Sequence, residues 1–297
     1  MALRSFPGFQ LVAQKFVEFF CERPQHLYLS GRSIQVGRHQ YGTLHQVFQT
    51  CCQALDVQPV PQLFISRNAI ADSYALGYEQ PCIVLSAGVV DYLDDTELSV
   101  LLAHELGHLK CNHAVLTQMA IWATGAVSFL GDLSLGLGNL ISTSLMYNFY
   151  EWRRQAELSA DRAALLVIDD FPTVARAIAK LAGGIKRFED EFQLESLLQQ
   201  AEAQRDFEQD ELSDAYKFFL YSSMQEAMMG HPFPIDRLYH LQVWQRSEEY
   251  RQIRLGDYAR DRSAGDASGL SSEALRRQVQ SLQQEIERLK RQQTGDS

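Results

Sequence analysis

Cysteine is scarce in this sequence, and its pattern excludes several classes of protein. The 297 residues include five cysteines, and no two of them form a Cys-x-x-Cys pair. An odd number without such a pair argues against a disulfide framework and indicates a reducing compartment. The apolar core of a secretory signal is also missing, because Lys15 and Glu18 interrupt the apolar residues of segment 9–22. We therefore expect a cytoplasmic protein that can also associate with a membrane.

Positive charge is in deficit, with 27 Lys and Arg residues against 37 Asp and Glu residues and a net charge of −10. This balance excludes nucleic acid as a partner, since phosphate binding needs a basic surface. The length and the 46% hydrophobic content suffice for one large domain, which we place at 1–258. A small, polar linker follows at 259–270. Residues 271–297 then carry a short a/d repeat, which either docks on a partner or mediates weak self-association.

Charged residues are almost absent from segment 111–150, where Asp132 is the only Asp, Glu, Lys or Arg. The two apolar halves are about 18 residues long, near the lower limit for crossing a bilayer. Glycines and hydroxyl side chains weaken the second half as a spanning helix. For the hairpin 114–150 we therefore favour a buried position, or peripheral contact with a membrane, over integral insertion.

The chain does contain a His-Glu-x-x-His motif inside a helical pattern. Asp94 followed by Glu97 resembles a capping box, and leucines then recur at helical spacing. On such a helix His104 and His108 lie one turn apart on the same face, so both imidazoles can bind one metal ion. Glu105 is placed to act as a general base toward a water at that metal. A chance match on a buried helix is the alternative.

A catalytic zinc site needs a third protein ligand. His113 is one candidate, but on a continuing helix it would be rotated by about 140° from His108. Glu157 is the better candidate, on a second helix where Asp161 lies one turn further along the same face. Asp161 would orient a ligand imidazole, with Arg154 close by. The alternative is a solvent-facing acid pair beside Arg153 and Arg154.

Together these motifs resemble the M48 family of zinc metallopeptidases, which includes the CAAX prenyl proteases and bacterial heat-shock membrane proteases. The resemblance is carried by His-Glu-Leu-Gly-His at 104–108 and by Arg-x-x-Glu-x-x-Ala-Asp at 154–161. The strands around 74–88 and the segment His-Pro-Phe-Pro-Ile-Asp-Arg-Leu at 231–238 also resemble family motifs, in the same order. Asp72 and Ser73 depart from the family pattern, where Asn-Ala is usual, which puts the substrate preference in doubt.

The resemblance implies a mostly α-helical α+β fold of the zincin type, with a small sheet beside the active-site helix. It implies one zinc ion per chain and gives His231 the role of stabilising the oxyanion of the tetrahedral intermediate. Arg237 would anchor its segment to buried carboxylates. A protein or peptide substrate would lie extended along the strand Tyr74-Ala75-Leu76-Gly77.

Local patterns predict the remaining elements. We expect a short hairpin at 27–37 around Gly31, a helix at 43–55, and short strands at 63–65, 74–77 and 83–86. A helix that begins near 172 should end at Gly183-Gly184.

Two functions of another class compete with a zinc-dependent endopeptidase. A chaperone-like or binding module would keep the fold without turnover, but the intact His-Glu-x-x-His motif argues against it. A structural zinc protein needs four filled ligand positions, usually with thiolates, and Cys111 is the only cysteine near the motif.

Overall fold

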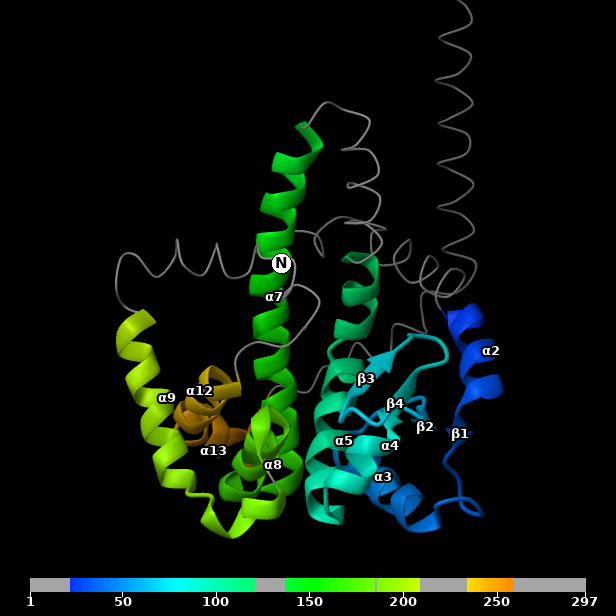
Figure 1. Ribbon diagram of the computed structural model, residues 1–297, viewed down its shortest axis with the longest axis horizontal. Coiled ribbons are helices and arrows are strands. Elements are labelled where there is room, and N and C mark those ends of the chain that lie inside the picture. The colour runs from blue at the N-terminus through cyan, green and yellow to red at the C-terminus, as the bar shows by residue number, and fades with distance from the viewer. Residues whose placement is uncertain (1–21, 121–136, 185, 209–233, 259–297) are drawn as a thin grey trace, which may run out of the picture. The chain divides into compact units, whose positions relative to one another are not determined.

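The computed structural model describes residues 22–120, 137–184, 186–208 and 234–258 (Figure 1). The chain divides into two compact units, residues 1–250 and 251–297, and the elements discussed below belong to the first, except that α13 (Glu248–Arg254) begins in the first and ends in the second. The predicted linker 259–270 and the helix 271–297 lie outside the described residues. Helices predominate and one small sheet accompanies them, which confirms the predicted α+β class.

The sheet has four strands in the order β1-β2-β4-β3, namely β1 Ile34–Gln35, β2 Gln62–Ser66, β3 Ser73–Leu76 and β4 Cys82–Ser86. β2 and β4 pair in parallel, while β1 and β3 are antiparallel to their neighbours. Every residue of β4 is buried, as expected for a central strand covered on both faces. β3 therefore forms one edge of the sheet, and it contacts the helix that carries the His-Glu-x-x-His motif. The strands predicted at 63–65 and 83–86 are confirmed.

The hairpin predicted at 27–37 is wrong. A helix, α2 (Arg23–Arg32), occupies most of this segment, and only β1 is extended. Pro24 stands in the first turn of α2, where its fixed φ and missing N–H are tolerated. Leu29 of this helix packs against Phe64 and Val84 of the sheet. This tertiary contact outweighs the weak local alternation around Gly31.

The remaining helices include the one predicted at 43–55, which is confirmed as α3. A second confirmed feature is the end of α8 at Gly183, with Gly184 as its C-cap. In chain order the helical elements after the first strand include α3 Gly42–Ala54, α4 Ala87–Tyr92, α5 Asp95–Lys110, α7 Leu137–Ile168, α8 Phe171–Gly183, η3 Lys186–Glu191, α9 Leu194–Glu208, α12 Pro234–Gln245 and α13 Glu248–Arg254, and a helical segment at 113–120 lies between α5 and α7.

The helix α5 begins with the predicted capping box. The Asp94 side chain accepts hydrogen bonds from the backbone N–H groups of Thr96 and Glu97, and Glu97 in turn accepts one from the N–H of Asp94. This reciprocal cap satisfies N–H groups that have no partner within the helix. Nearly all of the following side chains up to Gly107 are buried.

α5 and α7 lie side by side at a close crossing (Figure 1). At this crossing Gly107 faces Ala160 and Ala163, and a Cβ added to Gly107 would lie 2.8 Å from the Cβ of Ala163. Small side chains thus let the two backbones approach and bring the His-Glu-x-x-His face of α5 next to α7.

Parts of the predicted hairpin 114–150 are described, as residues 114–120 and as the first half of α7, and both are helical. Among the helices of the described part of the chain, none combines the length and the apolar character that crossing a membrane requires.

Candidate metal centre

Three potential metal ligands converge between α5 and α7. The Nε2 atoms of His104 and His108 are 3.1 Å apart, and the Glu157 carboxylate oxygens lie 3.3 Å from the first nitrogen and 3.5 Å from the second. Ligands at about 2.1 Å from a tetrahedral zinc ion are separated by about 3.4 Å, and the three observed distances, which involve both oxygens of the carboxylate, are close to this value. Among the described residues this is the one grouping of three His, Cys, Asp or Glu side chains close enough to hold a metal ion.

The charges around these ligands also suit a divalent cation. The carboxylates of Glu105, Glu157 and Asp161 are all buried, and the guanidinium of Arg237 lies against two of them. Three anions beside one cation leave two negative charges, and buried charges are normally paired or bound to metal. The donor set of two imidazoles and one carboxylate is typical of catalytic zinc. The residues present therefore fit the metal that the motif implies.

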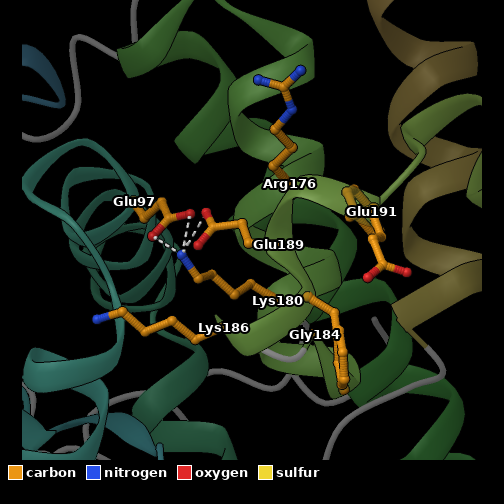
Figure 2. Close-up of a pocket in the computed structure, with 10 residues that line it drawn as sticks. Glu97, Arg176, Lys180, Gly184, Lys186, Glu189 and Glu191 are labelled. Carbon is orange, nitrogen blue, oxygen red and sulfur yellow. Dashed lines mark hydrogen bonds and ion pairs between the residues drawn. The ribbon is translucent and has the colours of Figure 1, made fainter.

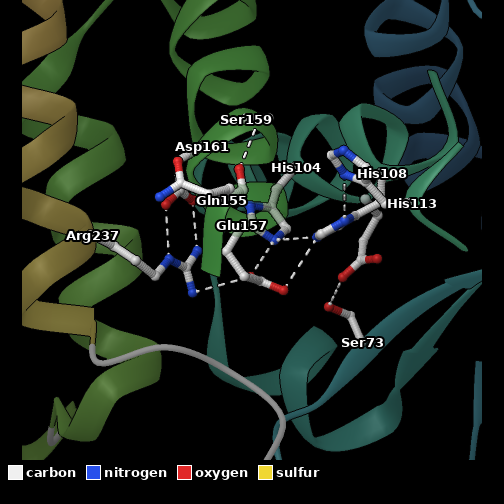
Figure 3. A network of polar contacts seen from close by, with 10 residues as sticks. Ser73, His104, His108, His113, Gln155, Glu157, Ser159, Asp161 and Arg237 are labelled. Atoms are coloured by element: carbon white, nitrogen blue, oxygen red, sulfur yellow. Dashed lines mark hydrogen bonds and ion pairs between the residues drawn. The ribbon is translucent and has the colours of Figure 1, made fainter. Parts of the chain in front are cut away.

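Asp161 and Arg237 form a buried ion pair on the side of His104 that faces away from His108 (Figure 3). His104 donates from Nδ1 to Asp161 at 2.9 Å, and Arg237 donates to the same carboxylate at 2.8 and 2.6 Å. The predicted anchoring of Arg237 to buried carboxylates is thereby confirmed. With its Nδ1 proton held in this way, His104 directs Nε2 toward the metal position.

The contacts among Asp161, Arg237 and His104 also shift the pKa values of Asp161 and His104. Burial alone would raise the pKa of Asp161, but Arg237 and His104 outweigh it and lower the pKa to about 2. Burial would likewise lower the pKa of His104, yet the hydrogen bonds to Asp161 and Glu157 raise it to about 10. In the absence of a metal ion an imidazolium is thus favoured, which again indicates that the cluster attracts positive charge.

Glu105 follows the first histidine on α5 and reaches toward the sheet. Ser73, the first residue of β3, donates a hydrogen bond from Oγ to Oε1 of Glu105 at 2.6 Å (Figure 3). The sequence did not single out Ser73 for this contact. The alternation along β3 was the available signal, because it places Ser73 on the face opposite to the exposed Tyr74.

The structure contradicts the expected course of the chain at His113. α5 ends at Lys110, and Asn112 adopts a left-handed conformation with φ of 57°, after which a new helical segment, 113–120, begins. This turn brings Nδ1 of His113 to 3.2 Å from Nδ1 of His108. The expected rotation away from His108 is therefore wrong, because it assumed a continuous helix.

The strand predicted for the substrate matches β3 at Tyr74, Ala75 and Leu76. Gly77 lies just beyond the strand with φ of 89°, and a Cβ there would come within 3.0 Å of Gln80 and of Glu22. Gly77 is therefore a turn residue between β3 and β4, where a side chain would be strained.

The remaining predicted residues are Arg154 and His231. Arg154 donates to Asp236 of α12 at 3.3 Å, so it links α7 to α12. His231 lies outside the described residues, and its role stays a prediction.

A cavity of about 150 Å³ adjoins the ligands on the side of α8. His104, Glu105 and Asp161 line one side of it, and most of the remaining wall is apolar, formed by Val89, Val100, Leu101, Ala177, Ile178, Leu181 and Ala182. A polar group and an apolar side chain of a bound molecule could thus be accommodated next to each other.

A larger cavity, of about 450 Å³, lies between α8 and η3 (Figure 2). Its wall includes Lys180, which pairs with Glu97 at 3.0 Å and with Glu189 at 3.1 Å. These ion pairs tie the start of α5 to α8 and η3, which is a structural role. We therefore place the chemistry at the smaller cavity, which His104 and Glu105 line.

Comparisons with known proteins agree with this geometry. The family model for peptidase family M48 matches residues 38–245. A relative from Arabidopsis thaliana, "Plastoglobule-localized metallopeptidase 48, chloroplastic", is 30% identical over 261 residues, which cover 85% of this chain and 71% of the relative.

Microbial relatives match over shorter stretches. "Protease HtpX homolog 2" of Methanosarcina mazei is 26% identical over 192 residues, or 57% of this chain and 65% of the relative. "Protease HtpX homolog" of Trichormus variabilis is 30% identical over 105 residues, or 34% of this chain and 36% of the relative. A family match over most of the chain, together with the converging ligands, leads to one conclusion: the chain belongs to peptidase family M48 and is a metallopeptidase.

Proposed function

We propose that this metallopeptidase is a zinc-dependent endopeptidase in which His104, His108 and Glu157 bind one zinc ion per chain. The observation that carries the proposal is the set of distances of 3.1, 3.3 and 3.5 Å among these ligands, beside the buried Glu105. When bound, zinc lowers the pKa of a coordinated water toward neutrality and polarises a carbonyl group.

Glu105 acts as the general base and then as the general acid. It accepts a proton from the attacking water as the new C–O bond forms, and it returns this proton to the amine nitrogen as the C–N bond breaks. The hydrogen bond from Ser73 holds one oxygen of the carboxylate, so the other stays oriented toward the water. Asp161 and Arg237 keep the ring of His104 in place during both steps. His231 is proposed to stabilise the oxyanion.

The substrate is a protein or peptide in extended conformation. Among the described strands, β3 pairs with β4 alone. A substrate backbone can add along the other edge of β3. The cavity of about 150 Å³ next to Glu105 then receives an apolar substrate side chain. The exposed Tyr74 lies on the solvent side of this strand.

We further propose that substrates are membrane-associated or partly unfolded, as in protein quality control near membranes. Segment 114–150 begins shortly after α5 and ends shortly before Glu157. Its low charge makes it the part of the chain best suited to contact lipid or exposed apolar polypeptide. A clear preference for compact, folded soluble proteins in a cleavage assay would contradict this proposal.

The mechanism is tested by Glu105→Gln, which removes the base but keeps the shape of the side chain. We expect the variant to retain zinc and to lose proteolysis of a generic unfolded protein by about 10²- to 10⁴-fold. Glu151→Gln, a change on α7 away from the three ligands, serves as the matched control and should keep full activity. Undiminished turnover by pure Glu105→Gln protein would remove this residue from the mechanism.

A further inference from the structure

We propose that His113 is a positioning residue that holds the ring of His108 in the orientation needed for metal binding, an inference that rests on the proposed zinc site. The Nε2 atom of His108 points to the other two ligands, at 3.1 Å from His104 and 3.5 Å from Glu157. Its Nδ1 atom faces away from them and lies 3.2 Å from Nδ1 of His113. The two nitrogens of one ring thus have separate partners.

The hydrogen bond fixes the tautomer of His108. A neutral imidazole that gives Nε2 to a metal must carry its proton on Nδ1, where it can only donate. Nδ1 of His113 is then the acceptor, so the proton of neutral His113 resides on its Nε2. Metal-bound histidines generally donate their second N–H to such an acceptor, which restricts the ring and makes it a better ligand.

The structure holds His113 firmly in this position. The side chain is buried, and its ring packs in a T-shaped arrangement with that of Trp152 of α7, with ring centres 5.7 Å apart. The left-handed turn at Asn112 sets the start of the helical segment 113–120. His113 thus bridges the metal-binding face of α5 and a residue of α7 close to Glu157.

The groups that accept a hydrogen bond from Nδ1 of His104 and of His108 differ in charge. This difference is consistent with the charge balance of the site. His104 donates to Asp161, whose charge is compensated by Arg237. His108 donates to a neutral imidazole instead. A carboxylate in place of His113 would add a further buried anion to a cluster that a divalent ion already neutralises, at a considerable cost in desolvation.

Two variants of His113 separate the hydrogen bond from packing. His113→Asn keeps an acceptor, because Oδ1 of asparagine can occupy the position of Nδ1, whereas His113→Phe keeps an aromatic ring without an acceptor. Zinc affinity is measured by competition with a chromophoric chelator, and the visible spectrum of the Co²⁺-loaded protein reports the ligand geometry. Thermal unfolding of the metal-free proteins checks the fold, and exposed His39→Ala controls for loss of any histidine.

We expect His113→Phe to bind zinc about 10- to 100-fold more weakly and to alter the Co²⁺ spectrum, with kcat reduced and KM unchanged at saturating metal. His113→Asn and His39→Ala should stay within a few fold of the wild type. Wild-type affinity in His113→Phe would overturn the positioning role while leaving the zinc site intact. An equal loss in the Phe and Asn variants would also overturn it, in favour of packing or direct ligation. A wild-type protein that binds no metal would instead refute the proposed function itself.

Discussion

The close crossing of α5 and α7 makes Gly107→Ala a sensitive test of how the site is built. The added Cβ would lie 2.8 Å from the Cβ of Ala163 and 3.1 Å from the Cα of Ala160. Carbon atoms pack best at about 3.5–4.0 Å, so the two helices must separate by several tenths of an ångström up to about 1 Å. Neither neighbour is a flexible side chain, and therefore neither can turn aside.

The expected change in the free energy of unfolding of Gly107→Ala follows from two opposing effects. Overpacking of this kind costs about 1–3 kcal/mol, while alanine in a helix is favoured over glycine by about 1 kcal/mol. We expect the metal-free variant to be about 1 kcal/mol less stable than the wild type. The separation also moves Glu157 away from both histidines and lengthens the distances of 3.3 and 3.5 Å. Zinc affinity should therefore fall at least about tenfold, which corresponds to about 1.4 kcal/mol.

The assay combines urea unfolding of the metal-free protein with zinc titration against a chelator. Ala163→Gly in the same chain removes the nearest colliding atom and should restore much of the zinc affinity, as a double-mutant cycle would show. Gly31→Ala in α2, where no atom lies within 4 Å of the added Cβ, is the matched control and should not weaken binding. If Gly107→Ala binds zinc as tightly as the wild type, the close crossing does not set the ligand distances.

Three further predictions concern the ligands, the thiols and the membrane. Glu157→Ala should lose zinc in a metal titration while Glu151→Ala keeps it; equal affinity in both would exclude Glu157 as a ligand. At pH 8–9 an alkylating reagent should modify the exposed Cys111 before the three buried thiols of Cys51, Cys52 and Cys82, because burial raises the pKa values of these three, to about 11 for one and about 12 for two. These raised pKa values also mean that stability is fully present below the unfolded thiol pKa of about 8.5 and declines as the pH rises toward 11–12, which urea unfolding across this range can follow. Carbonate should extract the protein from membranes, and resistance that deletion of 116–146 abolishes would show integral insertion.

Local features of the sequence predicted the parts of the site that lie within one helix. The Asp94 and Glu97 cap and the spacing of His104 and His108 involve residues within one turn, and helix geometry alone places them. The pairing of Glu157 with Asp161 on one face of α7 follows in the same way. The strands β2 and β4 were also predicted from short apolar runs, because the buried pattern of a central strand is continuous in sequence.

The predictions for segment 27–37 and for His113 were wrong because features outside the local pattern decided the course of the chain. Segment 27–37 alternates like a hairpin, but α2 forms there because Leu29 is buried against β2 and β4. His113 was expected to turn away from the metal position, but the left-handed residue Asn112 redirects the chain. Asparagine is one of the few residues that tolerate this conformation, yet tolerance alone does not predict that it will be adopted.

The sequence by itself thus determined which side chains share a helix face, the family resemblance, and the pairing of a general base with two candidate ligands. Only the tertiary structure decided the distances between elements: Glu157 to the two histidines, Ser73 to Glu105, and His113 to His108. The physical reason is that helical periodicity is a property of neighbouring residues. The separation of α5 from α7 instead depends on the small residues at their crossing, which approach one another only when the whole unit packs.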